Sequence, residues 1–153
     1  MSRDQFSIGR ADSQDADAIA AMQVAMALET ENLPLDPHTV MRGVQRLFGE
    51  PDRGFYLVAK DPEGDVVACL LVLKEWSDWR NADVWWIHSV YVAPAHRGRG
   101  LFRRVFQEVE LLARAAGVAG LRLYVEKGNR RAQAVYRRLG LSAEHYLMFE
   151  KML

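Results

Sequence analysis

A short basic, glycine-containing segment in the middle of the chain is the clearest candidate for chemistry. The apolar run Val90–Val92 breaks at Pro94 and is followed by Arg97-Gly98-Arg99-Gly100, after which the pattern becomes helical. Glycine lets the backbone approach a ligand closely, and the first turn of a helix presents free N–H groups and the positive end of the helix dipole. The spacing therefore predicts a site for phosphate or pyrophosphate.

Two other phosphate-binding motifs do not fit this segment. It lacks the Gly-Lys-Ser/Thr ending of a P-loop, which argues against a nucleoside triphosphate with magnesium. It is not Gly-x-Gly-x-x-Gly either, which argues against a dinucleotide fold. A plain strand-to-helix connection with surface arginines has a similar pattern, so the rest of the chain has to decide between the two interpretations.

The composition is that of an ordinary globular chain. Of its 153 residues, 50% are hydrophobic and 26% charged, which predicts one domain over residues 1–153. The first residues lack the apolar core of a signal peptide, and no apolar run approaches the ~20 residues of a membrane span. The single cysteine, Cys69, falls in a predicted strand. We therefore expect a cytoplasmic protein without a disulfide and without membrane attachment, in which Cys69 fills the core.

Charge is balanced over the whole chain but unevenly distributed. Residues 1–96 carry 8 Lys and Arg against 15 Asp and Glu, whereas residues 97–138 carry 11 against 3. Base-stacking aromatic side chains are not interleaved with the basic residues, so a compact phosphorylated ligand fits better than nucleic acid. The four histidines occur singly, without the spacing of metal ligands, and no metal is expected.

Hydrophobic periodicity predicts the element order β-α-α-β-β-β-α-β-α-β. Strands are expected at 6–8, 55–59, 66–73, 84–92, 121–125 and 145–149, and helices from the cap at 12 or 13 to about 30, at 40–48, from the Arg/Gly turn to 117, and from the cap at 129 to 139. The strand at 121–125 follows a helical crossover and should run parallel to the one before it. This pattern predicts an α+β fold with one parallel strand pair.

Two motifs together resemble the GNAT superfamily of acetyl-CoA-dependent N-acetyltransferases. The family pattern Arg/Gln-x-x-Gly-x-Gly/Ala falls on Arg97, Gly100 and Phe102, and the pattern Asn-x-x-Ala-x-x-x-Tyr falls on Asn129, Ala132 and Tyr136. The element order agrees along nearly the whole chain. The resemblance implies a central, mixed, mostly antiparallel sheet that splays at one parallel strand pair and is flanked by helices. Phe102 departs from the usual Gly or Ala, and we expect its side chain to pack away from the ligand.

The resemblance also implies acetyl-CoA as cosubstrate and assigns its binding residues. The pantetheine arm would lie between the strand at 90–92 and the strand at 123–125, and the turn would hold the pyrophosphate. A backbone N–H near Val90 would stabilise the oxyanion, and the Tyr136 hydroxyl would protonate the departing thiolate; spacing alone would make Tyr136 a core tyrosine. The implied cofactor site consists of Val90, Tyr91, Val92, Arg97, Gly98, Arg99, Gly100, Leu101, Phe102, Asn129, Ala132 and Tyr136.

The general base and the acceptor site have several candidates. His88 stands where many members of the family carry Glu and could relay a proton, or it could be a core histidine; uninterrupted alternation places it on one face with Val90. Glu29 and Glu31 could hold a cationic amine, or be a solvated pair at a helix end. The tryptophans at 76, 79 and 86, close to the buried-looking Trp85, could form an acceptor pocket or simply pack. The predicted acceptor site is Glu29, Glu31, Trp76, Trp79, Trp86 and His88.

The resulting functional hypothesis is direct acetyl transfer from acetyl-CoA to a primary amine in a ternary complex, with Tyr136 and His88 as catalytic residues. A non-catalytic acyl-CoA-binding or sensor module of the same fold is the alternative. The acceptor is a small molecule or a peptide amine, and neither nucleic acid nor membrane is an expected partner. Members of the family frequently dimerise, which leaves a homodimer open.

Overall fold

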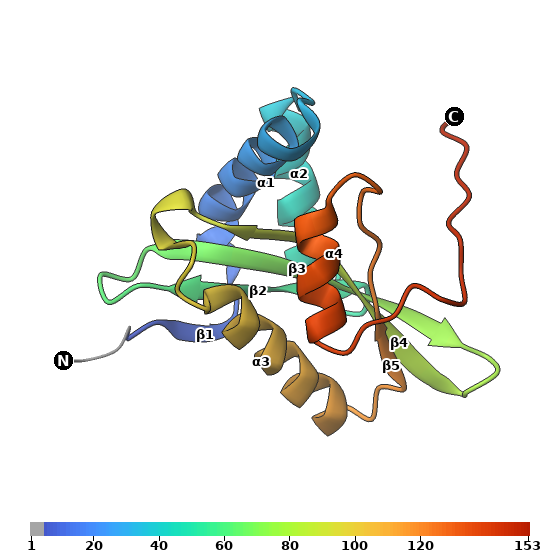
Figure 1. Ribbon diagram of the computed structural model, residues 1–153. Helices are drawn as coiled ribbons and strands as arrows, with labels where there is room; N and C mark the ends of the chain where they lie inside the picture. The colour runs from blue at the N-terminus through green and yellow to red at the C-terminus, as the bar shows by residue number, and fades with distance from the viewer. Residues whose placement is uncertain (1–4) are drawn as a thin grey trace. The chain divides into compact units, whose positions relative to one another are not determined.

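The computed structural model describes residues 5–153 of the chain (Figure 1). Close contacts divide the chain into two compact units, one ending at Arg122 and one comprising Leu123–Leu153. The first unit contains strands β1 to β5 and helices α1 to α3, and the second contains helix α4. The candidate phosphate-binding turn therefore belongs entirely to the first unit.

A five-stranded sheet forms the centre of the first unit. Its strand order is β1-β2-β3-β4-β5; every neighbouring pair is antiparallel except β4 and β5, which are parallel. This confirms the α+β class and the mixed sheet with one parallel pair. The strands are β1 (Ser7–Arg10), β2 (Gly54–Lys60), β3 (Val66–Ser77), β4 (Ala82–Val92) and β5 (Gly120–Arg122).

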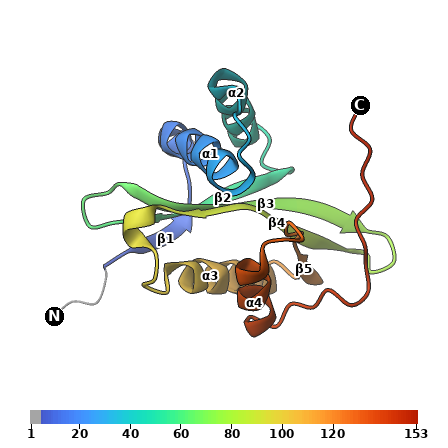
Figure 2. The same ribbon diagram turned by 45° about the horizontal axis from the view of Figure 1, so that its top comes forward.

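Helices cover both faces of this sheet (Figure 2). α1 (Ala16–Glu31) and α2 (Pro37–Phe48) lie on one face, and α3 (Leu101–Ala115) lies on the other. Ile19 of α1 and Val44 of α2 are buried against Tyr56 and Cys69 of the sheet. Because the central strands are covered on both sides, they consist of nearly continuous apolar residues, as buried strands do.

Aspartate side chains cap the N-terminal helical segments, and α2 begins at Pro37, three residues before the predicted start. Asp12 accepts a hydrogen bond from the Gln14 backbone N–H (2.8 Å), and its own N–H donates to Asp15 (3.0 Å), which makes a capping box for the short 3-10 turn before α1. Asp36 caps α2 by accepting from the N–H of Thr39 at 3.1 Å. None of the helices in residues 5–153 is long and apolar enough to cross a membrane.

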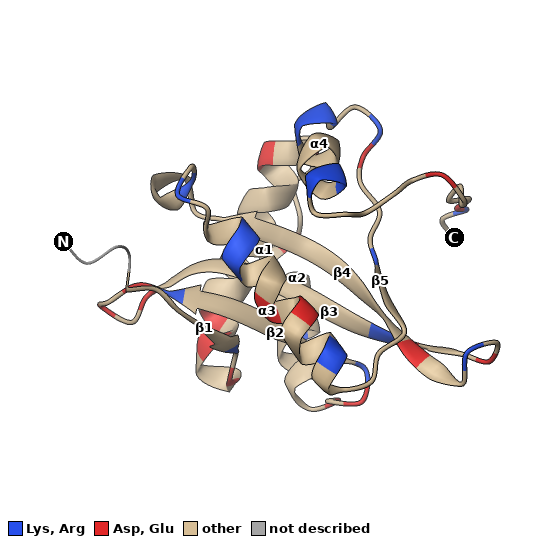
Figure 3. Cartoon of the chain, turned by 60° about the horizontal axis from the view of Figure 1, so that its bottom comes forward, with Lys and Arg blue, Asp and Glu red and all other residues tan. Residues whose placement is uncertain are grey.

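The second unit contains helix α4 (Arg130–Arg138), which the sequence also predicts. The Asn129 side chain accepts a hydrogen bond from the Ala132 N–H at 3.1 Å and so caps the helix. The helix ends at Gly140, whose φ of +91° is in the left-handed region that glycine adopts without strain. Arginines occupy both ends of α4 (Figure 3).

Two predicted strands differ in the structure. β5 ends at Arg122 instead of continuing to 125, and residues 145–149 form no strand; the side chains of Leu147 and Phe149 are 79% and 88% exposed. A strand is defined by its ladder of hydrogen bonds with a neighbour, and alternation in the sequence does not supply that neighbour. The final strand is therefore a wrong prediction, and β5 is shorter than predicted.

Replacing Phe106 of α3 by alanine tests the packing on the second face of the sheet. Phe106 is 2% exposed, so the Phe106→Ala variant should lose about 3–5 kcal/mol of unfolding free energy in urea denaturation, from lost burial and the cavity left behind. The control is Leu111→Ala on the same helix, which is 64% exposed and should change stability by less than about 0.5 kcal/mol. Equal losses in the two variants would contradict this packing.

Candidate functional site: the end of strand β4 and the turn before helix α3

Strand β4 is interrupted near its end by a β-bulge at Ser89 and Val90. His88 lies opposite Leu71 of β3 and Tyr91 lies opposite Cys69, so the single residue Leu70 faces both Ser89 and Val90. Ser89 has a φ of +53°, a left-handed conformation that non-glycine residues rarely adopt. Such strain is concentrated at functional sites, and the sequence pattern does not predict it.

The bulge changes which side chains of β4 share a face. Leu71 and Cys69 are two residues apart on β3 and point the same way, so their partners His88 and Tyr91 also share one face. That is the face covered by α1 and α2, because Tyr91 belongs to the core cluster of those helices. The prediction that His88 lies with Val90 by uninterrupted alternation is wrong, since the extra residue reverses the alternation.

The parallel pairing of β4 with β5 is short. Its register runs from Val84 opposite Gly120 to Trp86 opposite Arg122, and the ladder does not continue toward the bulge. Unpaired backbone groups along a strand edge can be satisfied by an extended ligand that binds like an additional strand. The end of β4, with Val90 and Val92, therefore has the properties of a ligand-binding edge.

The turn after β4 adopts the conformation that its glycines permit. Gly98 and Gly100 have φ values of +78° and +73°, and no atom outside the immediately adjoining chain lies within 4 Å of the position where a Cβ would stand on either residue. Gly100 is also the N-cap of α3 and provides no side-chain hydrogen bond to the first helical N–H groups. These donors and the open space beside them fit an anionic group such as a pyrophosphate.

The two residues that follow the turn are held by the protein interior. Leu101 is 2% exposed, and the Phe102 ring lies 6.3 Å from the ring of Phe106 on the same helix. Phe102 is half-buried and contacts its own helix, and its orientation relative to a bound ligand stays a prediction. The backbone at the start of α3 is thereby fixed by two side chains next to the candidate anion site.

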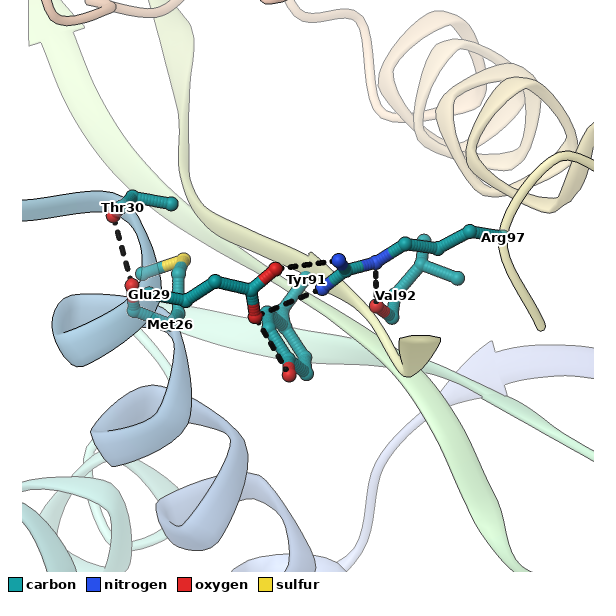
Figure 4. A network of polar contacts seen from close by, with 6 residues as sticks. All are labelled: Met26, Glu29, Thr30, Tyr91, Val92 and Arg97. Carbon is teal, nitrogen blue, oxygen red and sulfur yellow. Dashed lines mark hydrogen bonds and ion pairs between the residues drawn. The ribbon is translucent and has the colours of Figure 1, made fainter. Parts of the chain in front are cut away.

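The side chain of Arg97 belongs to a network with α1 (Figure 4). Its Nη1 and Nη2 donate to the two carboxylate oxygens of Glu29 at 2.5 and 3.0 Å, and its Nε donates to the carbonyl oxygen of Val92 at 2.8 Å. The Tyr91 hydroxyl donates to the same carboxylate at 3.2 Å, and the guanidinium lies 5.3 Å from the Tyr91 ring centre. The last turn of α1 is therefore joined to the turn before α3.

This network perturbs the ionisation of its members. The hydrogen bond with Arg97 holds the pKa of Glu29 below its usual value, and the same bond raises the pKa of Arg97. Burial, and then the Glu29 carboxylate, raise the pKa of Tyr91. Glu29 is thus an ionised partner of Arg97 in this structure, a contact that spacing along the sequence does not reveal. Glu31, two residues further on, is exposed at the end of α1.

His88 is half-buried next to Trp86. Their rings are stacked, with centres 6.0 Å apart and planes at 12°. Burial lowers the pKa of His88, so its imidazole is neutral at neutral pH and can accept a proton. The Trp86 indole N–H donates to Glu75 at 3.1 Å, and Arg122 donates to the same carboxylate at 3.0 Å. Glu75 positions Trp86, a role that sequence analysis does not assign to it.

The four tryptophans do not form one cluster. Trp85 is buried and packs edge-on against Phe55, with ring centres 5.3 Å apart. Trp76 and Trp79 are 64% and 87% exposed and lie at the hairpin between β3 and β4. β4 spans eleven residues from that hairpin to Val92, or roughly 30 Å. The structure thus brings Trp86 close to His88 but leaves Trp76 and Trp79 at the opposite end of the strand from the turn.

Tyr136 and its motif partners lie in the second unit. Tyr136 is half-buried on α4, and burial raises the pKa of its hydroxyl, which keeps the group protonated. The structure shows Asn129 and Ala132 paired with each other as the cap of this helix. The cofactor-binding roles of these three residues therefore stay predictions.

Comparison with known proteins agrees with the fold and the two motifs. Residues 20–141 match the model of the Acetyltransferase (GNAT) family, and the chain belongs to that family. It is 36% identical to a possible acetyltransferase from Clostridium difficile 630, with a TM-score of 0.90 and 97% of each chain covered. An aminoglycoside acetyltransferase from an uncultured soil metagenomic sample shares the fold, at 22% identity and a TM-score of 0.77 over 100% of this chain and 99% of that one.

A curated relative of known substrate is more distant. The chain is 32% identical over 100 residues to thialysine N-epsilon-acetyltransferase of Bos taurus, a match that covers 61% of this chain and 58% of the bovine protein. Proteins of the GNAT family acetylate amine acceptors, and membership implies use of acetyl-CoA. The resemblance inferred from the two sequence motifs is thus confirmed at the level of the family.

The Glu29–Arg97 ion pair predicts a pH-dependent contribution to stability. Because the pKa of Glu29 is lowered on folding, the contribution is complete above the usual pKa of a glutamate and is lost as the pH falls through the lowered value. Urea denaturation of wild type and Glu29→Gln between about pH 7 and pH 3 should show wild type more stable at neutral pH and the difference vanishing in acid. High salt should shrink the difference, since the pair is part-exposed.

Glu31→Gln is the matched control, because this carboxylate lies outside the network of Figure 4. Arg97→Gln should reproduce the behaviour of Glu29→Gln, and the double variant should lose no more than either single variant. Additive losses in the double variant would show that the two side chains do not act as a pair.

Proposed function

We propose that this chain transfers the acetyl group of acetyl-CoA directly to a primary amine. The observation that carries the proposal is the start of α3: two glycines with positive φ precede a helix whose first N–H groups have no side-chain cap, immediately after a strand with a free edge. A strand edge that leads into such a helix start fits a ligand with an extended arm and a pyrophosphate at its end.

On the donor side, the backbone N–H groups of residues 98–102 bind the pyrophosphate. Arg99 adds positive charge at the turn, and the edge of β4 at residues 90–92 binds the pantetheine arm. The bulge at Ser89 turns the backbone of Val90 away from the regular ladder with β3, which frees an N–H group to stabilise the developing oxyanion. Bound in this way, acetyl-CoA supplies an activated thioester.

On the acceptor side, the amine must lose a proton as its nitrogen bonds to the acetyl carbon and the carbon–sulfur bond breaks. His88 takes that proton, directly or through a water molecule, and its lowered pKa keeps the imidazole in the neutral form that can accept it. Tyr136 returns a proton to the thiolate. Two observations support its role: its place in the family motif and the raised pKa that keeps its hydroxyl protonated.

The state of the single cysteine supports transfer without a covalent enzyme intermediate. Cys69 is 1% exposed, and burial raises its pKa to about 12, so its thiol is neither accessible nor ionised at neutral pH. Direct attack by the amine in a ternary complex requires no such group.

Replacing Gly100 by aspartate tests the pyrophosphate site. A carboxylate at the start of α3 would repel a pyrophosphate, so the affinity for CoA, measured by titration calorimetry, should fall at least about tenfold. Gly117→Asp is the control, because Gly117 has a φ of +71° and open space like Gly100 but follows the C-terminal end of α3. Equal CoA affinity in the two variants would refute the assignment of the turn.

Thiol release from acetyl-CoA with a panel of amines tests the activity itself. The panel contains diamines, amino acids with side-chain amines, aminoglycosides and peptides, and it includes thialysine because the bovine relative is named for that substrate.

Tyr136→Phe should keep wild-type CoA affinity and lose most of kcat. His88→Ala should remove the acidic limb of the pH–rate profile. CoA binding without turnover on any amine would instead identify a non-catalytic acyl-CoA sensor.

A further inference from the structure

A cavity of about 260 Å³ opens on the sheet face covered by α1 and α2. Its apolar part is formed by Leu47 of α2, Tyr56 of β2, and Leu71 and Leu73 of β3. Two cations, Arg46 of α2 and Arg53 before β2, also line it, together with Gly43. The cavity is separate from the turn before α3, and it contains none of the predicted acceptor residues.

The two arginines are held in place by one carboxylate. Glu50 accepts a hydrogen bond from Nε of Arg46 at 2.9 Å and another from Nε of Arg53 at 2.5 Å. Both bonds use Nε, which leaves the terminal Nη groups as donors, and the three side chains together carry one net positive charge. Guanidinium Nη groups donate in pairs to a carboxylate, which makes this group an anion receptor beside an apolar wall.

The strand register places this cavity next to the predicted reaction site. Tyr56 lies opposite Leu71, and Leu71 lies opposite His88, so the three side chains form a row across β2, β3 and β4 on one face of the sheet. The row from Tyr56 to His88 is two strand spacings long, roughly 10 Å. Leu73 lies opposite Trp86, which extends the apolar wall toward the ring stacked on His88.

From this arrangement we infer that the amine acceptor carries a carboxylate, which Arg46 and Arg53 bind, while its aliphatic chain lies along Leu71 and Leu73 and its primary amine reaches His88. The inference rests on the proposed function, which places the reacting amine at His88. An amino acid with a side-chain amine carries a carboxylate and a primary amine at opposite ends of an aliphatic chain, the same order as the arginines, the apolar wall and His88. The substrate class is therefore an amino acid with a terminal side-chain amine.

The test compares amines that differ only in the carboxylate. For wild type, kcat/KM should be higher for L-lysine than for cadaverine, and higher for L-ornithine than for putrescine. In Arg53→Gln, the ratio of kcat/KM for lysine to that for cadaverine should fall about tenfold, the effect of one charge-assisted hydrogen bond. Arg46→Gln should lower the ratio in the same direction, and Arg53→Lys should restore part of it because it keeps the charge.

Arg42→Gln is the control variant. Arg42 is an exposed arginine of the same helix, bonded to Thr39 and absent from the cavity lining, so its replacement should leave the ratio unchanged. If no amine of the panel is acetylated, the proposed function fails. If amines are acetylated but no carboxylate-bearing one exceeds its decarboxylated counterpart, or Arg53→Gln leaves the ratio unchanged, only the present inference is overturned.

Discussion

One extra residue in strand β4 determines the geometry of the candidate site. Because Ser89 and Val90 together face Leu70, the face on which β4 presents its side chains changes at this point, and His88 and Tyr91 lie together under α1 and α2. The same irregularity interrupts the ladder with β3 at the place where the proposed function puts the backbone N–H that stabilises the oxyanion. The rest of the first unit holds this bulge in place. The pairing with β3 fixes the register on both sides of the bulge, and helices on both faces of the sheet bury β4.

The elements could be predicted from the sequence because their signals are local. Asp12 caps the 3-10 turn that leads into α1 and Asn129 caps α4, as expected, and the glycines at 98 and 100 lie in the conformation that only glycine adopts easily. The bulge could not be predicted, since a serine with positive φ has no signature in a run of apolar residues. The final strand was expected from the mostly apolar run at 145–149, but pairing depends on a partner that such a run does not specify.

The ion pair between Glu29 and Arg97 could not be predicted from the sequence either. Arg97 follows β4, and Glu29 lies in the last turn of α1, 68 residues earlier, yet the two form a bidentate ion pair. The resemblance to the GNAT family assigned Arg97 to the anionic ligand, and it made Glu29 a candidate for holding a cationic acceptor. In the structure these two side chains bind each other, so binding of the anionic ligand relies on the backbone N–H groups of the turn. The cavity lined by Arg46 and Arg53 fits the inferred acceptor, which carries a carboxylate as well as an amine.

Because Cys69 is buried, its reactivity toward a thiol reagent reports how often the protein core opens. A dye that reacts with thiols cannot reach a side chain that is 1% exposed in the centre of β3, so labelling requires the sheet to separate from α1. With one cysteine in the chain, each labelled molecule records one such event. The rate of labelling as a function of denaturant then measures how often the core that supports the bulge comes apart, without any engineered probe.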